Sequence, residues 1–285
     1  MHPTVIEPLL AAGVPAMQGA KPALSAIKHY LDWCQWTRPP VVADADVPIS
    51  ANKWIPRLQN GEKLSEREAK EFLADHGLPT TREQLASDAD DAVAIAIRLG
   101  FPVVMKIESA DIAHKTEIGG VRLGIDSEQS VRVAFDEILA NARQHAPSAR
   151  LNGVVVQEMV SGGVEMIVGM SMQRPFGPAI VVGSGGIMVE LVKDSALALA
   201  PVHPERATAL VGATRASRLL KGYRGSAPAD IRALEDLVVR LSAISVAYAD
   251  QLDAIDLNPV SVLPNGKGVR ILDAFISPTA AQNQS

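Results

Sequence analysis

The sequence has little cysteine and no long uncharged apolar stretch. Its single cysteine, Cys34, excludes an intrachain disulfide and a cysteine-cluster metal site, and it fits a reducing compartment. No apolar stretch reaches the roughly 18 to 20 residues that a membrane span requires. The N-terminus, MHPTVIEPLL, also lacks the basic and apolar regions of a secretory leader. We therefore predict a cytoplasmic protein that does not insert into a membrane.

Long blocks of basic residues are also missing. The formal net charge is −5, so the sequence does not predict the basic surface typical of nucleic-acid-binding proteins. With 285 residues and 47% hydrophobic content, the chain can bury a substantial core in one large or two modest domains. An anionic ligand would have to be held by a few local cations.

The apolar pattern divides the chain into several parts. Residues 22–36 predict a helix with one apolar stripe, and the prolines and acids of residues 38–48 predict a linker. The main body has the mixed pattern of an α+β (α/β) protein. The predicted parts are an N-terminal segment (1–50), a first subdomain (51–155), a second subdomain (156–278) and a polar tail (279–285).

Within the main body, capping residues and turns predict the individual elements. Ser65 and Glu68 form a capping box before a helix that Gly77 ends, and Ser87 caps a helix that runs to Gly100. From residue 151 onward, closely spaced strands predict an antiparallel sheet. The remaining predictions are helices over 127–144, 204–220 and 229–248, and strands over 252–263 and 268–276 joined by an Asn265-Gly266 turn.

Residues 101–120, FPVVMKIESADIAHKTEIGG, carry the strongest chemical signal. Strand alternation places Lys106 on the face opposite Met105, toward a cleft. His114, Lys115 and the pair Gly119-Gly120 follow. Polyphosphates need fixed cations and bare backbone N–H donors, and glycine lets the backbone approach them. Taken alone, the pattern leaves open a strand-end lysine in water and an exposed loop histidine.

Two further clusters are weaker taken alone. Glu158, Met159 and Val160 leave a strand before a glycine turn and Glu165, a pattern that suits a purine or an ordinary hairpin with solvated acids. The Asp256-Leu257-Asn258-Pro259 run and Asp273 supply oxygen atoms of the kind that magnesium prefers beside a phosphate, although Asp and Asn are also common turn residues.

In this order, the segments FPVVMKI, DIAHKTEIGGV, QEMVSGGVEMIVG, RPFGPAIVVGSGGIMVELVKD and DLNPV resemble the ATP-grasp domain of ADP-forming acyl-CoA synthetases, relatives of succinyl-CoA synthetase. The resemblance covers residues 52–276 and implies an ATP-grasp fold, in which two α+β subdomains clasp a nucleotide. The N-terminal segment resembles the end of the CoA-ligating domain. Most of that domain has no counterpart, so we expect one subunit of a split enzyme or part of a longer protein.

The resemblance also implies a role for each candidate residue. Lys106 and Lys115 would contact nucleotide phosphates, and His114 would be transiently phosphorylated. The remaining implied roles are phosphate cover by Gly119 and Gly120, adenine binding by Glu158, Met159 and Val160, ribose contact by Glu165, magnesium binding by Asp256, Asn258 and Asp273, and weaker phosphate contacts by Glu190 and Asp194.

The implied function is the phosphoryl-transferring half of an ADP-forming acyl-CoA synthetase. Its cofactors would be ATP or ADP and Mg²⁺, and its partner a CoA-ligating subunit or domain. The alternative is a catalytically silent nucleotide-sensing or scaffolding module of a larger acyl-CoA or acyltransferase protein. A ligase that joins a carboxylate to an amine is a third possibility, against which the His114-Lys115-Thr116 segment argues. Neither the acyl group nor the assembly state follows from the sequence.

Overall fold

The computed structural model describes residues 3–13, 16–17, 19–35, 53–112, 114–185, 194–223 and 225–279. The chain separates into two compact units, residues 1–43 and 44–285, and each is treated on its own below. Within the described ranges, no helix is both long enough and apolar enough to cross a membrane.

The first unit contains two helices, α1 (Pro3–Ala11) and α2 (Ala20–Gln35). Helix α2 begins two residues before the predicted start and carries the predicted apolar stripe. None of its side chains is buried, and Leu24, Ile27 and Leu31 are each more than half exposed. The predicted linker over 38–48 lies outside the described residues.

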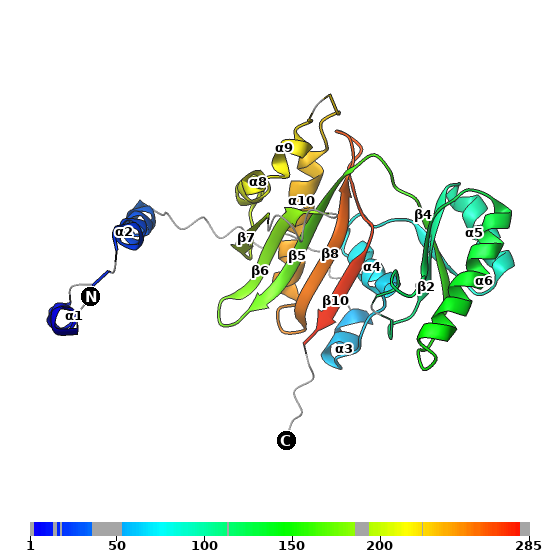
Figure 1. Ribbon diagram of the computed structural model, residues 1–285, viewed down its shortest axis with the longest axis horizontal. Helices are drawn as coiled ribbons and strands as arrows, with labels where there is room; N and C mark the ends of the chain where they lie inside the picture. Colours follow the sequence, from blue (N-terminus) through cyan, green and yellow to red (C-terminus); the bar gives the residue numbers. More distant parts are fainter. Residues whose placement is uncertain are drawn as a thin grey trace, which may run out of the picture. The chain divides into compact units, whose positions relative to one another are not determined.

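In the described part of the second unit, the strands form two antiparallel sheets. The first sheet has the order β1 (Glu83–Ala86), β4 (Gly153–Glu158), β2 (Val103–Glu108) and β3 (Val121–Ile125). Helices α5 (Ala89–Leu99) and α6 (Glu128–His145) pack against it on one side (Figure 1). Val103, Met105 and Ile107 point into the core that these helices share with the sheet.

The second sheet has the order β10 (Ala274–Pro278), β8 (Leu252–Val262), β5 (Val164–Gln173), β6 (Gly177–Ser184) and β7 (Ser195–Leu199), and β9 (Val269–Ile271) also pairs with β8. Helices α8 (Pro204–Ala213) and α10 (Ile231–Ala247) contact it, with the short α9 (Ser217–Leu220) beside α8 (Figure 1). Met166, Val168, Ile255 and Leu257 face the core on that side. Because strand side chains alternate, Glu165, Asp256 and Asn258 project from the opposite face.

Helices α3 (Trp54–Gln59) and α4 (Glu66–Asp75) pack into the core of the second sheet, although the sequence places them in the first subdomain. The Phe72 ring lies 5.7 Å from that of Trp54 and 5.1 Å from that of Tyr248. Helix α4 therefore buries Phe72 and Leu73 against one sheet, while Glu66 and Lys70, one turn apart, form a separate face.

Several predicted elements match and others need correction. The Ser65–Glu68 capping box is present at the start of α4. Asp88 rather than Ser87 caps α5, because the Asp88 carboxylate accepts the Asp91 N–H. Strand β4 belongs to the first sheet, not to the sheet that follows, because it pairs with β1 on one side and β2 on the other. The apolar run IMVELV (187–192), one of the closely spaced strands expected after residue 151, falls outside the described residues.

Two segments predicted as single elements are interrupted. The helix predicted over 204–220 is split into α8 and α9. The last strand predicted over 268–276 is split into β9 and β10, with Leu272 and Asp273 between them. At this break the Leu272 N–H donates to Pro259 O at 3.0 Å, and Pro259 has no N–H with which to return a second ladder bond. The break places Asp273 beside the cavity described next.

Candidate phosphate and metal site

A cavity of about 730 Å³ lies between residues of the two sheets. This volume is within the range of small-molecule binding sites. Its polar lining consists of Ser65, which caps α4, Glu66 from α4, Lys106 from β2, residues of the loop between β2 and β3, Asp256 from β8 and Asp273. Leu64, Ile112, Val121, Leu123, Ala274 and Phe275 add apolar surface. Lysines and carboxylates from distant parts of the sequence therefore meet in one cavity.

Lys106 lies on the face of β2 that points away from the α5–α6 core. The residue is only 8% exposed, and its Nζ donates to Glu66 Oε1 at 2.5 Å and to Leu272 O at 3.3 Å. Asp273 Oδ2 lies 3.8 Å from the same nitrogen. Burial alone would lower the pKa of Lys106, but the Glu66 and Asp273 carboxylates outweigh it and raise the pKa above its ordinary value.

Glu66 is the acidic centre of this site and has three lysine partners. Its Oε1 is 2.5 Å from Lys106 Nζ and 3.3 Å from Lys70 Nζ, and its Oε2 is 2.8 Å from Lys115 Nζ. The Glu66 side chain is 9% exposed. Burial alone would raise the pKa of Glu66, yet the three ammonium groups hold it well below its ordinary range. The cluster therefore holds an ionised carboxylate among three cations.

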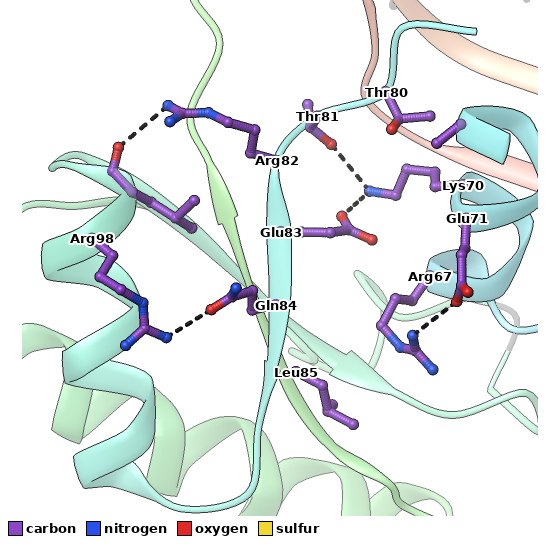
Figure 2. Close-up of a pocket in the computed structure, with 12 residues that line it drawn as sticks. Arg67, Lys70, Glu71, Thr80, Thr81, Arg82, Glu83, Gln84, Leu85 and Arg98 are labelled. Atoms are coloured by element: carbon purple, nitrogen blue, oxygen red, sulfur yellow. Dashed lines mark hydrogen bonds and ion pairs between the residues drawn. The ribbon is translucent and has the colours of Figure 1, made fainter. Parts of the chain in front are cut away.

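Lys70 extends the network toward strand β1. Figure 2 shows its side chain reaching from α4 to Thr81 and Glu83. The Lys70 Nζ also donates to Gln157 Oε1 at 2.9 Å and lies 3.3 Å from Leu272 O. Burial raises the pKa of Glu83 despite its contact with Lys70. A second cavity, of about 770 Å³, runs along β1 beside this lysine (Figure 2).

The loop between β2 and β3 carries the other candidate phosphate residues. Lys115 points inward to Glu66, whereas the His114 side chain is 79% exposed, with its Nδ1 3.9 Å from Glu117 Oε1. The N–H groups of Gly119 and Gly120 bond within the loop, to Thr116 O at 3.1 Å and Lys115 O at 2.8 Å. The sequence predicts bare N–H donors at these two glycines. Both donors are used by the turn itself.

Local geometry explains why glycine occupies both positions. Gly119 has φ +68°, a backbone conformation that residues with a Cβ rarely adopt. A Cβ at Gly120 would lie 2.8 Å from Ile107 Cγ2 and 3.0 Å from Lys115 O. The pair therefore shapes the loop tightly against β2, which keeps Lys115 over the cavity.

The candidate magnesium ligands lie on one side of the site. Asp256 and Asp273 line the cavity, and Asn258 shares the open face of β8 with Asp256. Desolvation raises the pKa of both Asp256 and Asp273. Among the residues that the structure describes, no group of three or more His, Cys, Asp and Glu is arranged for a metal. Two carboxylates and an amide fit Mg²⁺, which typically takes its other ligands from phosphate and water.

The structure does not bring the predicted purine-binding residues into the same cluster. The Glu158 carboxylate accepts from the backbone N–H of Arg82 at 3.0 Å and from Arg82 Nε at 2.6 Å. In the β2–β4 register Glu158 lies opposite Val103, on the helix-covered face, whereas Gln157 lies opposite Val104 on the Lys106 face. Met159, Val160 and Glu165 lie at or near the surface, beyond the end of β4 and in β5.

The two weaker phosphate candidates lie elsewhere or outside the described structure. Asp194 Oδ1 accepts the N–H of Arg215 at 2.7 Å, and Asp194 Oδ2 accepts the N–H of Ala216 at 3.0 Å. Ser184 Oγ also donates to Asp194. These bonds join the start of β7 to the α8–α9 turn. Glu190 falls outside the described residues.

Sequence reasoning missed Glu66, Lys70 and Glu83. Glu66 and Lys70 stand four residues apart in a helix, a spacing that ordinarily predicts a surface ion pair. The apolar stripe of α4 indicates one buried face, which carries Phe72 and Leu73. No local pattern indicates that Glu66 and Lys70 lie on a second, largely buried face, because most of their partners are on other elements.

Comparison with known proteins agrees with this geometry. Residues 57–277 match the ATP-grasp domain family. The chain is 36% identical over 261 residues to a 4-hydroxybutyrate–CoA ligase [ADP-forming] of Nitrosopumilus maritimus, a match that covers 91% of this chain but 37% of that relative. It is 37% identical to the acetate–CoA ligase [ADP-forming] II subunit beta of Pyrococcus furiosus, covering 76% of this chain and 92% of the subunit.

A solved structure gives the same result. The acetyl-coenzyme A synthetase 1 of Ca. Korarchaeum cryptofilum, in complex with coenzyme A, Ca-AMPCP and HgCl+, superimposes with a TM-score of 0.76 at 38% identity. The match covers 81% of this chain and 100% of that one. The chain thus has the ATP-grasp fold and belongs to the family that includes the beta subunits of ADP-forming acetate–CoA ligases.

Proposed function

We propose that this chain is the nucleotide-binding, phosphoryl-transferring half of an ADP-forming acyl-CoA synthetase. The whole reaction would be carboxylic acid + CoA + ATP ⇌ acyl-CoA + ADP + phosphate. The chain spans 37% of the 4-hydroxybutyrate–CoA ligase and 92% of the Pyrococcus beta subunit. A CoA-ligating subunit or domain would therefore supply the acyl chemistry, and we place the reaction in the cytoplasm.

The observation that carries the proposal is the meeting of Lys106, Lys115, Asp256 and Asp273 in one cavity of about 730 Å³. Phosphoryl transfer needs little covalent chemistry from the protein beyond fixed cations and correct alignment. Lys106 and Lys115 would offset the charge of the phosphates. Asp256, Asn258 and Asp273 would hold Mg²⁺, which, when bound, neutralises charge on the transferring group.

In this proposal His114 would receive the phosphoryl group. Its exposed imidazole stands next to Lys115 in the sequence and lines the same cavity. A neutral ring nitrogen has a lone pair that can attack phosphorus, forming a P–N bond as the bond to the nucleotide oxygen breaks. ADP leaves in that direction, and the reverse step regenerates ATP. His114 would thus relay the phosphoryl group between nucleotide and the CoA-ligating half.

Labelling with radioactive Mg-ATP tests this relay. The wild-type chain should acquire an acid-labile, base-stable phosphoryl adduct, which His114→Ala should abolish. His145→Ala serves as the matched control, because this exposed histidine lies at the end of α6, where its Nδ1 contacts Asn141 O. An adduct that survives in His114→Ala would place the relay at another residue.

A nucleotide-sensing module is the second candidate function. It would bind Mg-ATP but exchange no phosphoryl group, even with a CoA-ligating partner supplied. The presence of Lys106, His114 and Asp256 around one cavity favours the enzyme. Binding without any labelling or exchange would favour the sensor.

A further inference from the structure

We propose that Glu66 is a resident anion of the phosphate site, which gathers Lys70, Lys106 and Lys115 when nucleotide is absent and competes with the nucleotide phosphates for them. The inference rests on the proposed function, because it deepens the account of the same cavity. Glu66 would then set the affinity for nucleotide without taking part in the chemical step.

The geometry of the cluster imitates a bound phosphate. Three ammonium groups from three different elements, α4, β2 and the loop between β2 and β3, converge on the two oxygens of a single carboxylate. The contacts range from 2.5 to 3.3 Å, and each lysine side chain is at most 11% exposed. Lysine is a common phosphate-binding residue, and here a carboxylate of the protein itself accepts from three lysines.

Two of the three lysines can turn to a ligand, because they line the cavity together with Glu66. An ammonium group has three N–H donors, so Lys106 can share them between Glu66 and a phosphate oxygen. Lys115 makes its contact to Glu66 from a loop. Lys70 does not line this cavity and keeps Glu83 and Gln157 as partners. Glu66 would therefore retain Lys70 while Lys106 and Lys115 move partly to the nucleotide.

The carboxylate has two opposing effects on the site. It offsets the repulsion between three closely spaced cations, which holds the lysines together. It also repels an incoming phosphate, since like charges a few ångströms apart interact strongly where water is scarce. Uniformly tight binding of nucleotide would not accelerate the chemical step. A built-in competitor suits a reversible reaction in which nucleotide must both bind and leave.

Calorimetric titration of Glu66→Gln with Mg-ADP tests the competition. The substitution keeps the shape of the side chain and removes its charge, so the Kd should fall at least about tenfold. Adenosine has no phosphate, so its Kd should be the same for Glu66→Gln and for the wild type. The matched control is Glu71→Gln, because Glu71 lies on the same helix, is 44% exposed and pairs with Lys53 outside the cavity. Its Kd should equal that of the wild type.

Glu66→Asp provides a second test, which can be carried out even if Glu66→Gln does not fold. It keeps the charge but withdraws the carboxylate by one methylene, which loosens its hold on the lysines and should lower the Kd for Mg-ADP by about threefold. An unchanged or raised Kd for Mg-ADP in Glu66→Gln, or in Glu66→Asp if the neutral variant does not fold, would overturn the competition. Failure of the wild type to bind Mg-ADP would instead reject the proposed function.

Discussion

Replacing Lys106 with methionine separates the electrostatic role of this lysine from its structural role. Methionine keeps an unbranched apolar stem but removes the charge, and Glu66 would still contact Lys70 and Lys115 at 3.3 and 2.8 Å. Because the carboxylate is not left unpaired, we expect the free energy of unfolding to fall by only about 1–2 kcal/mol. Nucleotide phosphates, in contrast, would lose a charged hydrogen bond.

A hydrogen bond to a charged group contributes about 1.5–3 kcal/mol, so Lys106→Met should raise the Kd for Mg-ADP roughly 10- to 150-fold. Isothermal titration calorimetry measures this Kd, and urea unfolding measures the stability. Lys267→Met is the control, because Lys267 is exposed on the turn between β8 and β9. Undiminished uptake of Mg-ADP by a folded Lys106→Met variant would refute the assignment of this cavity to phosphate.

Three further predictions concern stability. Ser65→Ala removes the cap of α4 and the 2.6 Å hydrogen bond to the buried Glu108, so urea unfolding should show a loss of about 1–3 kcal/mol. Gly120→Ala should lower the melting temperature, because its Cβ would lie 2.8 Å from the Ile107 side chain of β2. The control Gly212→Ala lies in helix α8 with nothing within 4 Å of its Cβ, and it should leave the melting temperature unchanged or raise it. The pKa of Glu66 lies below its ordinary value of 4.5, so the stability that its charge contributes is fully present above that pH and is lost only as the pH falls through the lowered pKa. Urea unfolding of wild type and Glu66→Gln should therefore differ by a constant amount between about pH 8 and 6 and converge only in stronger acid, and convergence near neutrality would contradict this assignment.

The part of the site that lies within one stretch of chain was predictable. Strand alternation places Lys106 opposite Met105, and the structure has Met105 in the core and Lys106 at the cavity. The capping box of α4 and the boundaries of α6 also follow from local rules, because their hydrogen bonds join residues three or four positions apart. The order of the motifs between residues 101 and 260 was sufficient to indicate the family.

Local patterns did not predict which way individual side chains point, or which residues from distant parts of the chain they contact. In the segment that suggested a purine site, the side chains of Gln157 and Glu158 lie on opposite faces of β4. Glu158 accepts from Arg82, whereas Gln157 accepts from Lys70. The pair Gly119-Gly120 looked like a source of free N–H donors, yet the turn itself uses both.

The sequence by itself determined which residue types were available for phosphate and metal chemistry, and the periodicity that forms the helices and strands. Only the tertiary structure decided that Glu66 and Lys70 of α4 join Lys106 and Lys115 in one cluster. The physical reason is that Glu66 contacts Lys106 and Lys115 across 40 and 49 positions of the sequence, and only its contact with Lys70 lies within one helix. Their energy depends on burial between two packed sheets, which no single segment specifies.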